Sequence, residues 1–295
     1  MEHYTYRPVR FYLTVFGFTW GFWLISLLFK NTALMFVTML LGLIAPSVIA
    51  IVTIMTSKNK MLKEDLKRKL IGCYRIRPQY ILLAVAIFGV AVAISIGISV
   101  LFFGGSPDQF SFTEDFSFSI GGTSALLTIL LASVIEEVAW RGYGEDSVGQ
   151  YHTWFWESII FASIWACWHL PLFLIPGTYQ YTLTQLGPKY IINFLVSTIP
   201  IDFIQTWLYV KNRRSMLATI IFHLFINIFQ EKIAMTPETK IIETGVFCVA
   251  SAIIVILNRD MFFDRKHIGR ILEMQYEEDD RSEDKLQKVS AAVER

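Results

Sequence analysis

Long apolar runs separated by short polar stretches dominate this chain up to about residue 258. A transmembrane helix needs roughly 20 apolar residues to cross the hydrocarbon core of a bilayer, and eight runs are of about that length. They cover residues 11–29, 33–57, 80–103, 121–141, 154–175, 191–210, 215–231 and 241–258. The pattern predicts an all-α fold, a polytopic membrane bundle of eight transmembrane helices in one domain over residues 1–258. The highly charged residues 259–295 are expected to form a cytosolic tail, partly helical and partly disordered.

Positively charged residues are unevenly divided between the two ends of these segments. If the chain starts in the cytosol, 22 of its 26 Lys and Arg residues lie on the cytosolic side. The four on the other side are Lys30, Lys189, Lys232 and Lys240. Cytosolic loops of membrane proteins carry an excess of Lys and Arg, and an odd number of helices would destroy this separation. The sequence therefore predicts a multi-pass integral membrane protein with both termini in the cytosol.

Composition supports the lipid bilayer as one partner of the chain. Hydrophobic residues make up 54% and charged residues 17%, which excludes an ordinary soluble domain. The three scattered cysteines form no zinc or disulfide framework. Residues 58–79 are basic, with Leu62, Leu66 and Leu70 on one helical face, which is typical of a helix that lies in the membrane interface. Because that location accounts for the basic charges, we expect no nucleic-acid partner.

The stretch LASVIEEVAWRGYG, residues 131–144, places ionisable side chains in an apolar segment. Such groups are costly in lipid and usually mark a functional site with a partner close by. Glu137 and Arg141 are four residues apart and share one helical face, so they are placed to pair. Glu136 points about 100° away from Glu137 and has no local partner. It is the candidate for a reactive carboxylate.

Two histidines and an asparagine lie inside other apolar segments. His169 is in the fifth segment, and His223 and Asn227 lie four residues apart in the seventh. A lone histidine among aromatic residues is more often a packed core residue, but two of them beside an unpaired membrane Glu favour a catalytic site. Asn227 belongs to this site or, alternatively, forms a hydrogen bond between helices.

These residue types suit the hydrolysis of an amide bond. Glu136 would act as the general base that takes a proton from water. His169 would orient that water or pass a proton to the leaving amine. His223 and Asn227 would donate hydrogen bonds to an oxyanion.

Three motifs resemble those of the type II CAAX prenyl protease and bacteriocin-processing (CPBP) family of intramembrane proteases. EEVAWR matches EExxxR, HLFIN matches HxxxN, and WACWH stands where the family usually has FxxxH. Order and intervals agree over about residues 80–230, with the motif core at 121–230. The chain is similar to the Ras-converting-enzyme CAAX endopeptidase and looks like a prokaryotic homologue. Trp165 replaces the usual Phe, which keeps an aromatic wall but changes the shape of the local pocket.

The resemblance implies an endopeptidase that cleaves prenylated CaaX-type proteins after the modified cysteine and releases the C-terminal tripeptide. The catalytic residues that it implies are Glu136, His169, His223 and Asn227, and the supporting residues are Glu137 and Arg141. It also implies a prenylated peptide or protein as the substrate. We expect the site in an intramembrane cavity open to the cytosol, which admits a peptide from the cytosol and a prenyl chain from the lipid.

A metal-free mechanism is favoured, so no cofactor is expected, but zinc is possible. Glu136, His169 and His223 could form a His₂Glu zinc set with one open position. However, the chain has no HExxH motif. If zinc took Glu136, the general base would have to come from Glu137, which Arg141 is expected to occupy.

Two functions of other classes are compatible with these residues. One is a non-catalytic membrane protein that binds a lipidated peptide in the same cavity. The other is a proton-coupled transporter, against which the lack of internal repeats argues. An aspartyl intramembrane protease would need GxGD, which GYGED does not supply. Asp202 in the sixth segment is therefore expected to orient one of the histidines or to pair with a polar neighbour.

The depths of two of these residues in the bilayer conflict. Glu136 lies near the cytosolic end of the fourth segment, whereas His169 lies deep in the fifth. Either the fourth helix continues past Gly144, or residues 145–157 lie along the interface before the fifth helix turns in. The second is preferred because the two tryptophans near the start of the fifth helix suit an interfacial aromatic belt.

Overall fold

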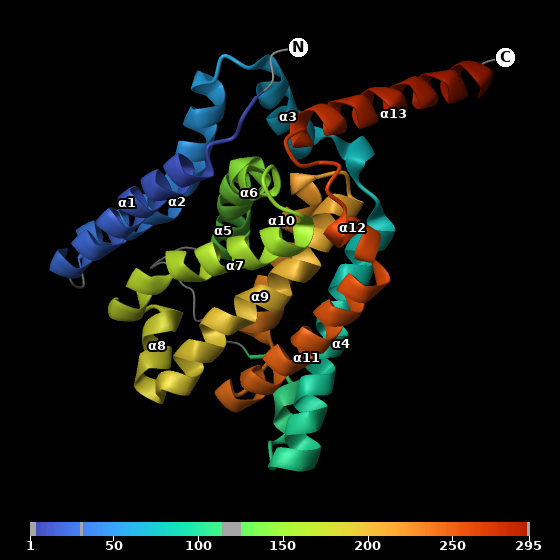
Figure 1. Ribbon diagram of the computed structural model, residues 1–295. Helices are drawn as coiled ribbons and strands as arrows, with labels where there is room; N and C mark the ends of the chain where they lie inside the picture. Colours follow the sequence, from blue (N-terminus) through green and yellow to red (C-terminus); the bar gives the residue numbers. More distant parts are fainter. Residues whose placement is uncertain (1–3, 30–31, 114–124, 294–295) are drawn as a thin grey trace.

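The computed structural model describes residues 4–29, 32–113 and 125–293 of the chain (Figure 1). Within these ranges the backbone forms helices and no strands, and one isolated antiparallel bridge joins Phe112 to Ile233. The longer helices are α1 (Pro8–Ser26), α2 (Ala33–Thr56), α3 (Lys60–Ile71), α4 (Pro78–Phe103), α5 (Ala125–Ala139), α7 (Trp154–Trp168), α9 (Pro188–Lys211), α10 (Met216–Lys232), α11 (Pro237–Leu257) and α13 (Ile271–Val293). The shorter ones are η1 (Leu27–Phe29), η2 (Cys73–Arg75), η3 (Pro107–Phe110), η4 (Trp140–Gly144), α6 (Glu145–Gly149), η5 (Leu170–Leu174), α8 (Tyr179–Leu186) and α12 (Arg259–Phe263).

Side-chain caps and prolines determine where several of these helices begin. The side chains of Thr32, Asn59 and Ser215 each accept a hydrogen bond from the backbone N–H three residues further on, at the starts of α2, α3 and α10. Such a cap satisfies one of the N–H groups that a helix start leaves unpaired. Helices α1, α4, α9 and α11 begin with a proline, which has no N–H to satisfy and a backbone angle suited to the first turn.

Within the described residues, six helices are long and apolar enough to cross a membrane. They match the first, second, third, fifth, sixth and eighth predicted segments and cover Pro8–Phe29, Ala33–Thr56, Pro78–Phe103, Trp154–Leu174, Pro188–Lys211 and Pro237–Leu257. The fourth and seventh predicted segments correspond to α5 and α10, which are 15 and 17 residues long. Residues 121–124 of the fourth lie outside the described residues. An all-helical, multi-pass membrane protein is confirmed, and the count of eight spans stays a prediction.

Helices α5 and α10 pack between the longer helices, although the first two turns of α5 are exposed at Leu126, Leu127, Leu130 and Leu131. Helix α1 pairs with α2, and α2 packs against α5, which packs against α10. On its other sides α10 contacts α4 and α9, and α9 continues the packing to α7 and α11. In Figure 1 the α1–α2 pair lies on the left and the α4–α11 pair on the right of this centre. Of the four candidate side chains on these two helices, Glu137 and His223 are buried, and Glu136 and Asn227 are partly buried.

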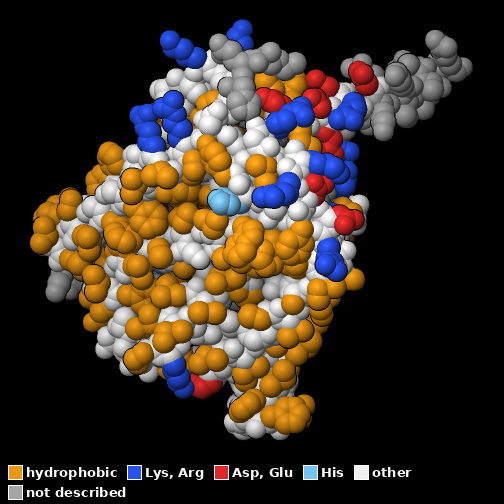
Figure 2. All heavy atoms as spheres, in the orientation of Figure 1, with side chains coloured by type: hydrophobic (Ala, Val, Ile, Leu, Met, Phe, Trp, Pro, Cys, Tyr) orange, Lys and Arg blue, Asp and Glu red, His pale blue; other side chains and the backbone are white. Residues whose placement is uncertain are grey.

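The surface separates an apolar flank from a charged end. Figure 2 shows hydrophobic side chains over most of the visible flank, with Lys, Arg, Asp and Glu gathered mainly toward the upper and right edges. On α4, for example, Leu82 and Leu101 are 70% and 77% exposed, as expected of side chains that face lipid. Helices α3 and α13 lie at the charged end, near both ends of the chain (Figure 1). This asymmetry fits a bundle that crosses a bilayer with its charged end in water.

A buried ion network fastens α3 to the bundle at this end. Lys69 forms ion pairs with Asp65, at 3.1 Å, and with Asp146 on α6. Arg214, between α9 and α10, pairs with both of these aspartates, at 2.8 Å from Asp65. Arg75 pairs with Asp65 at 3.4 Å and with Asp279 on α13. The network therefore joins α3, α6, the start of α10 and α13.

The expected apolar face of α3 is only partly correct. Leu62 is buried and Leu66 packs against the core, but Leu70 is exposed, and the next buried positions are Asp65 and Lys69. Burial alone would raise the pKa of Asp65, but Arg214, Lys69 and Arg75 together hold this pKa well below its ordinary value. Periodicity of apolar residues does not reveal a face that is buried through paired charges.

The helical backbone that begins with α5 extends past Gly144. It continues through η4, a π-helical turn, into α6, and the backbone N–H of Glu145 bonds to the carbonyl of Trp140. The carbonyl of Arg141 accepts hydrogen bonds from Lys69 Nζ, at 3.0 Å, and from the Tyr209 hydroxyl, at 3.2 Å. The first alternative, a fourth helix that continues past Gly144, is therefore confirmed as far as Gly149. Residue 154, one of the two tryptophans that favoured the second alternative, is buried in the bundle instead.

Candidate functional site

Helices α5 and α10 are joined by two hydrogen bonds one helical turn apart. On α10, His223 Nδ1 lies 2.9 Å from Glu137 Oε1, and Asn227 Nδ2 donates to Ser133 Oγ at 3.2 Å. The pairs advance by four residues on α10 and recede by four on α5, so the two helices are antiparallel and use matching rows. The shared face expected for His223 and Asn227 is present, and it points at α5. Asn227 does form the bond between helices that was its alternative role.

Arg141 is the centre of a fully buried group of carboxylates. Its Nε lies 3.3 Å from Glu137 Oε2 and 2.7 Å from Glu145 Oε2. Its Nη2 lies 2.9 Å from Asp202 Oδ1 on α9, and Phe161 covers the guanidinium with its ring 5.0 Å away. The contact predicted between Glu137 and Arg141 is thus present. Asp202 pairs with a polar neighbour, Arg141, and makes no hydrogen bond to either of the described histidines at the site.

Glu137 holds His223 in a defined orientation. Besides Arg141, Gln205 on α9 fixes this carboxylate, because its Nε2 donates to Oε1 at 2.8 Å. A carboxylate that accepts from Nδ1 requires the proton of the neutral ring to be on that nitrogen, which leaves Nε2 free. Nε2 of His223 therefore points away from Glu137, and no described residue forms a hydrogen bond with it.

His169 is held in the same way by a backbone group. It lies at the C-terminal cap of α7, where its Nδ1–H donates to the carbonyl of Trp165 at 2.7 Å. The rings of Trp168 and Phe194 contact the imidazole edge-to-face, with centroids 4.8 and 5.3 Å away. Nε2 is again the free nitrogen, and it carries a lone pair in the neutral ring.

Glu136 has no cationic partner in the described part of the chain, but two indole groups donate hydrogen bonds to it. Trp165 Nε1 donates to its Oε2 at 3.1 Å, and Trp140 Nε1 donates to the same oxygen at 3.4 Å. No described residue donates to Oε1. The side chain is partly buried, in contrast to the fully buried Glu137. Neighbouring carboxylates thus differ: one is enclosed by protein, and the other keeps an oxygen free.

Trp165 is the point at which the three candidate segments meet. While its N–H bonds to Glu136, its ring lies edge-to-face to His169 and to His223, with centroids 5.5 and 6.2 Å away. Glu136 also interacts electrostatically with both histidines. The structure thus brings Glu136, His169 and His223 to one place, with Asn227 one turn beyond His223.

Several residues of this arrangement were not identified from the sequence. Gln205, Ser133, Glu145 and the N–H group of Trp140 contact the candidate side chains but carry no motif of their own. Gln205 lies three residues after Asp202, and Ser133 lies four residues before Glu137, so each pair can share one helical face. Which partner each would meet depends on helix packing.

The candidate zinc ligands do not form a ready metal site. Among the described residues, no three His, Cys, Asp or Glu side chains are grouped so that they could hold a metal ion. Both indole N–H groups bond to Glu136 Oε2, so only Oε1 of this carboxylate stays open to a ligand. The zinc set stays an alternative prediction, and the chemistry below is derived from the side chains alone.

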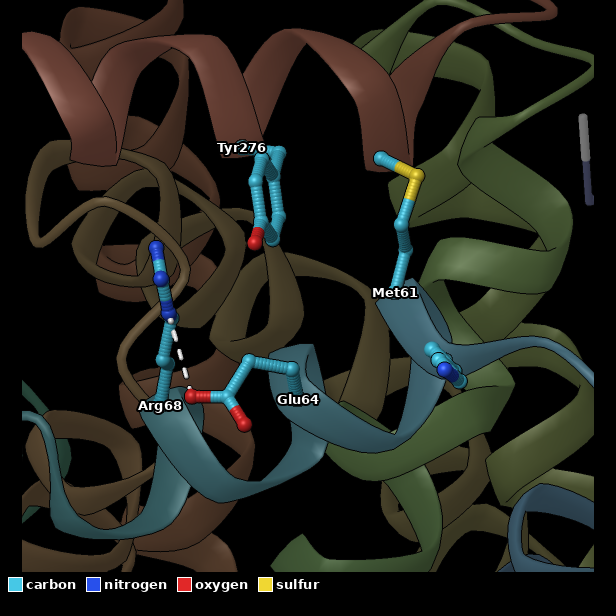
Figure 3. A pocket seen from close by; sticks show the side chains of 5 residues that line it. Met61, Glu64, Arg68 and Tyr276 are labelled. Atoms are coloured by element: carbon cyan, nitrogen blue, oxygen red, sulfur yellow. Dashed lines mark hydrogen bonds and ion pairs between the residues drawn. The ribbon is translucent and has the colours of Figure 1, made fainter. Parts of the chain in front are cut away.

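One hollow in the structure lies at the charged end and not at Glu136. It is found between α3 and α13 and is lined by Lys60, Met61, Glu64, Arg68 and Tyr276. Figure 3 shows Arg68 and Glu64 joined by their ion pair of 3.4 Å below the Tyr276 ring. None of the candidate residues lines it, so the cavity expected around Glu136 stays a prediction.

Comparisons with known proteins bear on the same region. Residues 121–229, which include every candidate side chain, match the family model described as type II CAAX prenyl endopeptidase Rce1-like. The chain is also 38% identical over 269 residues to a protein of Methanococcus maripaludis named CAAX prenyl protease 2. That similarity covers 90% of this chain and 99% of the relative.

Proposed function

This chain belongs to the type II CAAX prenyl endopeptidase family and is a membrane protease, and from that premise we propose its substrate and its mechanism. The substrate is a prenylated CaaX-type protein, cleaved after the modified cysteine with release of the C-terminal tripeptide. The observation that carries the proposal is the meeting of Glu136, His169 and His223 at Trp165. A carboxylate with a free oxygen and two imidazoles with free Nε2 atoms can activate water and handle its protons.

The first chemical step is attack by water on the scissile carbonyl. Glu136 Oε1, which no described residue occupies, accepts a proton from the water as general base. His169 orients that water through its free Nε2. The water oxygen bonds to the carbonyl carbon, and the carbonyl oxygen becomes an oxyanion.

The oxyanion is stabilised by donors on α10. When His223 is protonated, its pairing with the Glu137 carboxylate, 2.9 Å away, stabilises the imidazolium, and Nε2–H can donate. Asn227 Nδ2 has two N–H groups, of which Ser133 accepts one, so the other is available. Collapse of the intermediate then breaks the C–N bond, and the proton taken from water reaches the leaving amine through Glu136 or His169.

The proposed setting is an intramembrane cavity open to the cytosol, with both termini on that side. It is supported by the charged end of the bundle, which carries α3 and α13 (Figures 1 and 2). The ion network at that end contacts the Arg141 carbonyl through Lys69, one turn from Glu137. A peptide would enter from the charged end, and its prenyl chain would enter between the helices from the lipid.

Substitution of Glu136 by Gln tests this proposal against a protein that only binds lipidated peptides. We expect E136Q to lower the cleavage of a farnesylated CaaX peptide by about 100- to 10,000-fold, with binding of the peptide retained. The matched control is E243Q, which removes another buried carboxylate, to which Gln230, two turns along α10 from His223, donates at 2.9 Å. Unchanged cleavage by E136Q would contradict the mechanism. The zinc content of the same active wild-type sample is measured as well. Stoichiometric zinc whose removal also removes the activity would replace the metal-free mechanism with a zinc-dependent one.

A further inference from the structure

Trp165 contacts the candidate site through three different groups. Its indole N–H donates to Glu136 Oε2 at 3.1 Å, and its carbonyl oxygen accepts the Nδ1–H of His169 at 2.7 Å. Its ring is edge-to-face to both His169 and His223. The carbonyl contact is available to any residue at this position and the ring contacts to any aromatic one. The N–H contact needs the indole.

From this geometry we infer that Trp165 is a positioning residue, whose N–H holds Oε2 of Glu136 so that Oε1 stays directed at the water. The inference rests on the function proposed above and deepens it at the general base. A Glu side chain has three rotatable bonds and loses considerable freedom when it is fixed. A hydrogen bond to a carboxylate is charge-assisted and about twice as strong as one between neutral groups. One N–H can therefore select both the rotamer and the charged form.

The residue at this position makes the device particular to this chain. The FxxxH motif, which the segment Trp165–His169 resembles, usually has Phe where this chain has Trp165. Phenylalanine supplies a ring against the two histidines but no donor for Glu136. The replacement W165F therefore deletes one hydrogen bond, keeps the aromatic wall, and puts a residue at this site that the motif accepts.

Trp140 is the second donor and a less suitable position for the test. Its N–H reaches the same oxygen at 3.4 Å from one turn along α5. Its ring is fully buried, between Phe161 and Trp168, with centroids 5.9 and 5.5 Å away. A change at Trp140 would disturb this packing, whereas Trp165 is only partly buried. Trp140 would also keep some hold on Oε2 in W165F, so a partial loss of rate is expected.

The experiment compares W165F with the wild type and with W207F in the full-length protein. Trp207 on α9 is a buried tryptophan whose N–H has no hydrogen-bond partner in the described part of the chain. The cleavage of a farnesylated CaaX peptide is measured for each protein at pH 7. We expect kcat of W165F to fall about tenfold with KM unchanged. W207F should keep the wild-type kcat and KM.

Three results would overturn the inference. One is an unchanged kcat and KM in W165F. Another is a higher KM with unchanged kcat, which would make Trp165 a wall of the substrate site. The third needs no Trp165 variant: if wild type and E136A, labelled with ¹⁵N at the indole nitrogens, show no difference in any N–H resonance, no indole is bonded to Glu136. If E136Q is inactive while W165F is normal, the proposed function stands and only the positioning fails. If E136Q is active, the proposed function itself fails.

Discussion

Glu136 and Glu137 are adjacent in the sequence, yet their surroundings could hardly differ more. Glu137 is fully buried and engaged by Arg141, His223 and Gln205. Glu136 is partly buried and receives only indole donors, both on one oxygen. Because successive helical side chains point about 100° apart, Glu137 enters the packed centre and binds His223 Nδ1, whereas Glu136 points toward Trp165. Glu137 is therefore placed to hold Arg141 and His223, and Glu136 is placed to act as the proposed general base.

Ser133 offers a test of how Asn227 is held. In S133A the acceptor for Asn227 Nδ2 is lost, so the amide can rotate away from the oxyanion. We expect kcat to fall about tenfold, less than the 100- to 1,000-fold typical of removing an oxyanion donor, with KM unchanged. The control is S163A: Ser163 also bonds to the carbonyl four residues before it, at 2.7 Å, but is exposed and bonds to no other helix. Equal kcat values for S133A and S163A would rule out this role.

Contacts between residues close in the sequence were predictable, and contacts between distant residues were not. The pairing of Glu137 with Arg141 was predicted because four-residue spacing fixes it within one helix. The bonds from Trp165 to Glu136 and from Gln205 to Glu137 join residues 29 and 68 positions apart. No local periodicity encodes them, because they depend on how α7 and α9 pack against α5.

At the scale of the element, the hydropathy pattern and the structure differ in α5 and in α3. The apolar pattern of the fourth segment stops near Arg141, but the helix continues through the π-helical turn to Gly149. Buried ion pairs on Glu145 and Asp146 allow this continuation. A hydropathy pattern registers these residues as polar and ends the segment. The same reason explains why Leu70, and not Asp65, was expected inside the structure.

Asp65 provides a stability test of the α3 ion network. Because its pKa in the folded protein lies well below 3.8, the ordinary value, the ionised form stabilises the fold. That contribution is complete above about pH 4 and is lost as the pH falls further toward the folded pKa. We expect D65N to lower the stability at pH 7 by about 3 to 5 kcal/mol, the cost of breaking a buried pair. The difference from wild type should shrink below pH 4.

Thermal unfolding in detergent between pH 3 and pH 7 measures this effect. The matched control is E64Q on the same helix, because Glu64 pairs with Arg68 at 3.4 Å on the surface and should contribute less than about 1 kcal/mol. A D65N variant that unfolds together with E64Q at every pH would show that the network does not stabilise α3.

At the scale of the whole molecule, the apolar pattern predicted individual helices but not how they pack together. The six apolar helices were predictable because lipid imposes their length and hydropathy. The order of packing was not, since most helices in this bundle are apolar on several sides and periodicity cannot name their neighbours. The convergence of α5, α7 and α10 was suggested by their polar residues, which lipid does not tolerate. The polar residues of these three helices therefore predicted which helices lie together, which the apolar residues alone could not.

Cys73 can report which side of the membrane the charged end faces. It is an exposed residue between α3 and α4, whereas Cys167 and Cys248 lie within membrane-spanning helices. If both termini are cytosolic, a membrane-impermeant maleimide should label Cys73 in inverted vesicles and not in intact cells. The C73S variant should remain unlabelled in both preparations, because a charged reagent does not reach thiols in the lipid. Since Lys69 of α3 bonds to the Arg141 carbonyl, one turn from Glu137, the same label identifies the side nearest the site. Labelling in intact cells would place that side outside the cytosol, where no newly prenylated protein could reach Glu136.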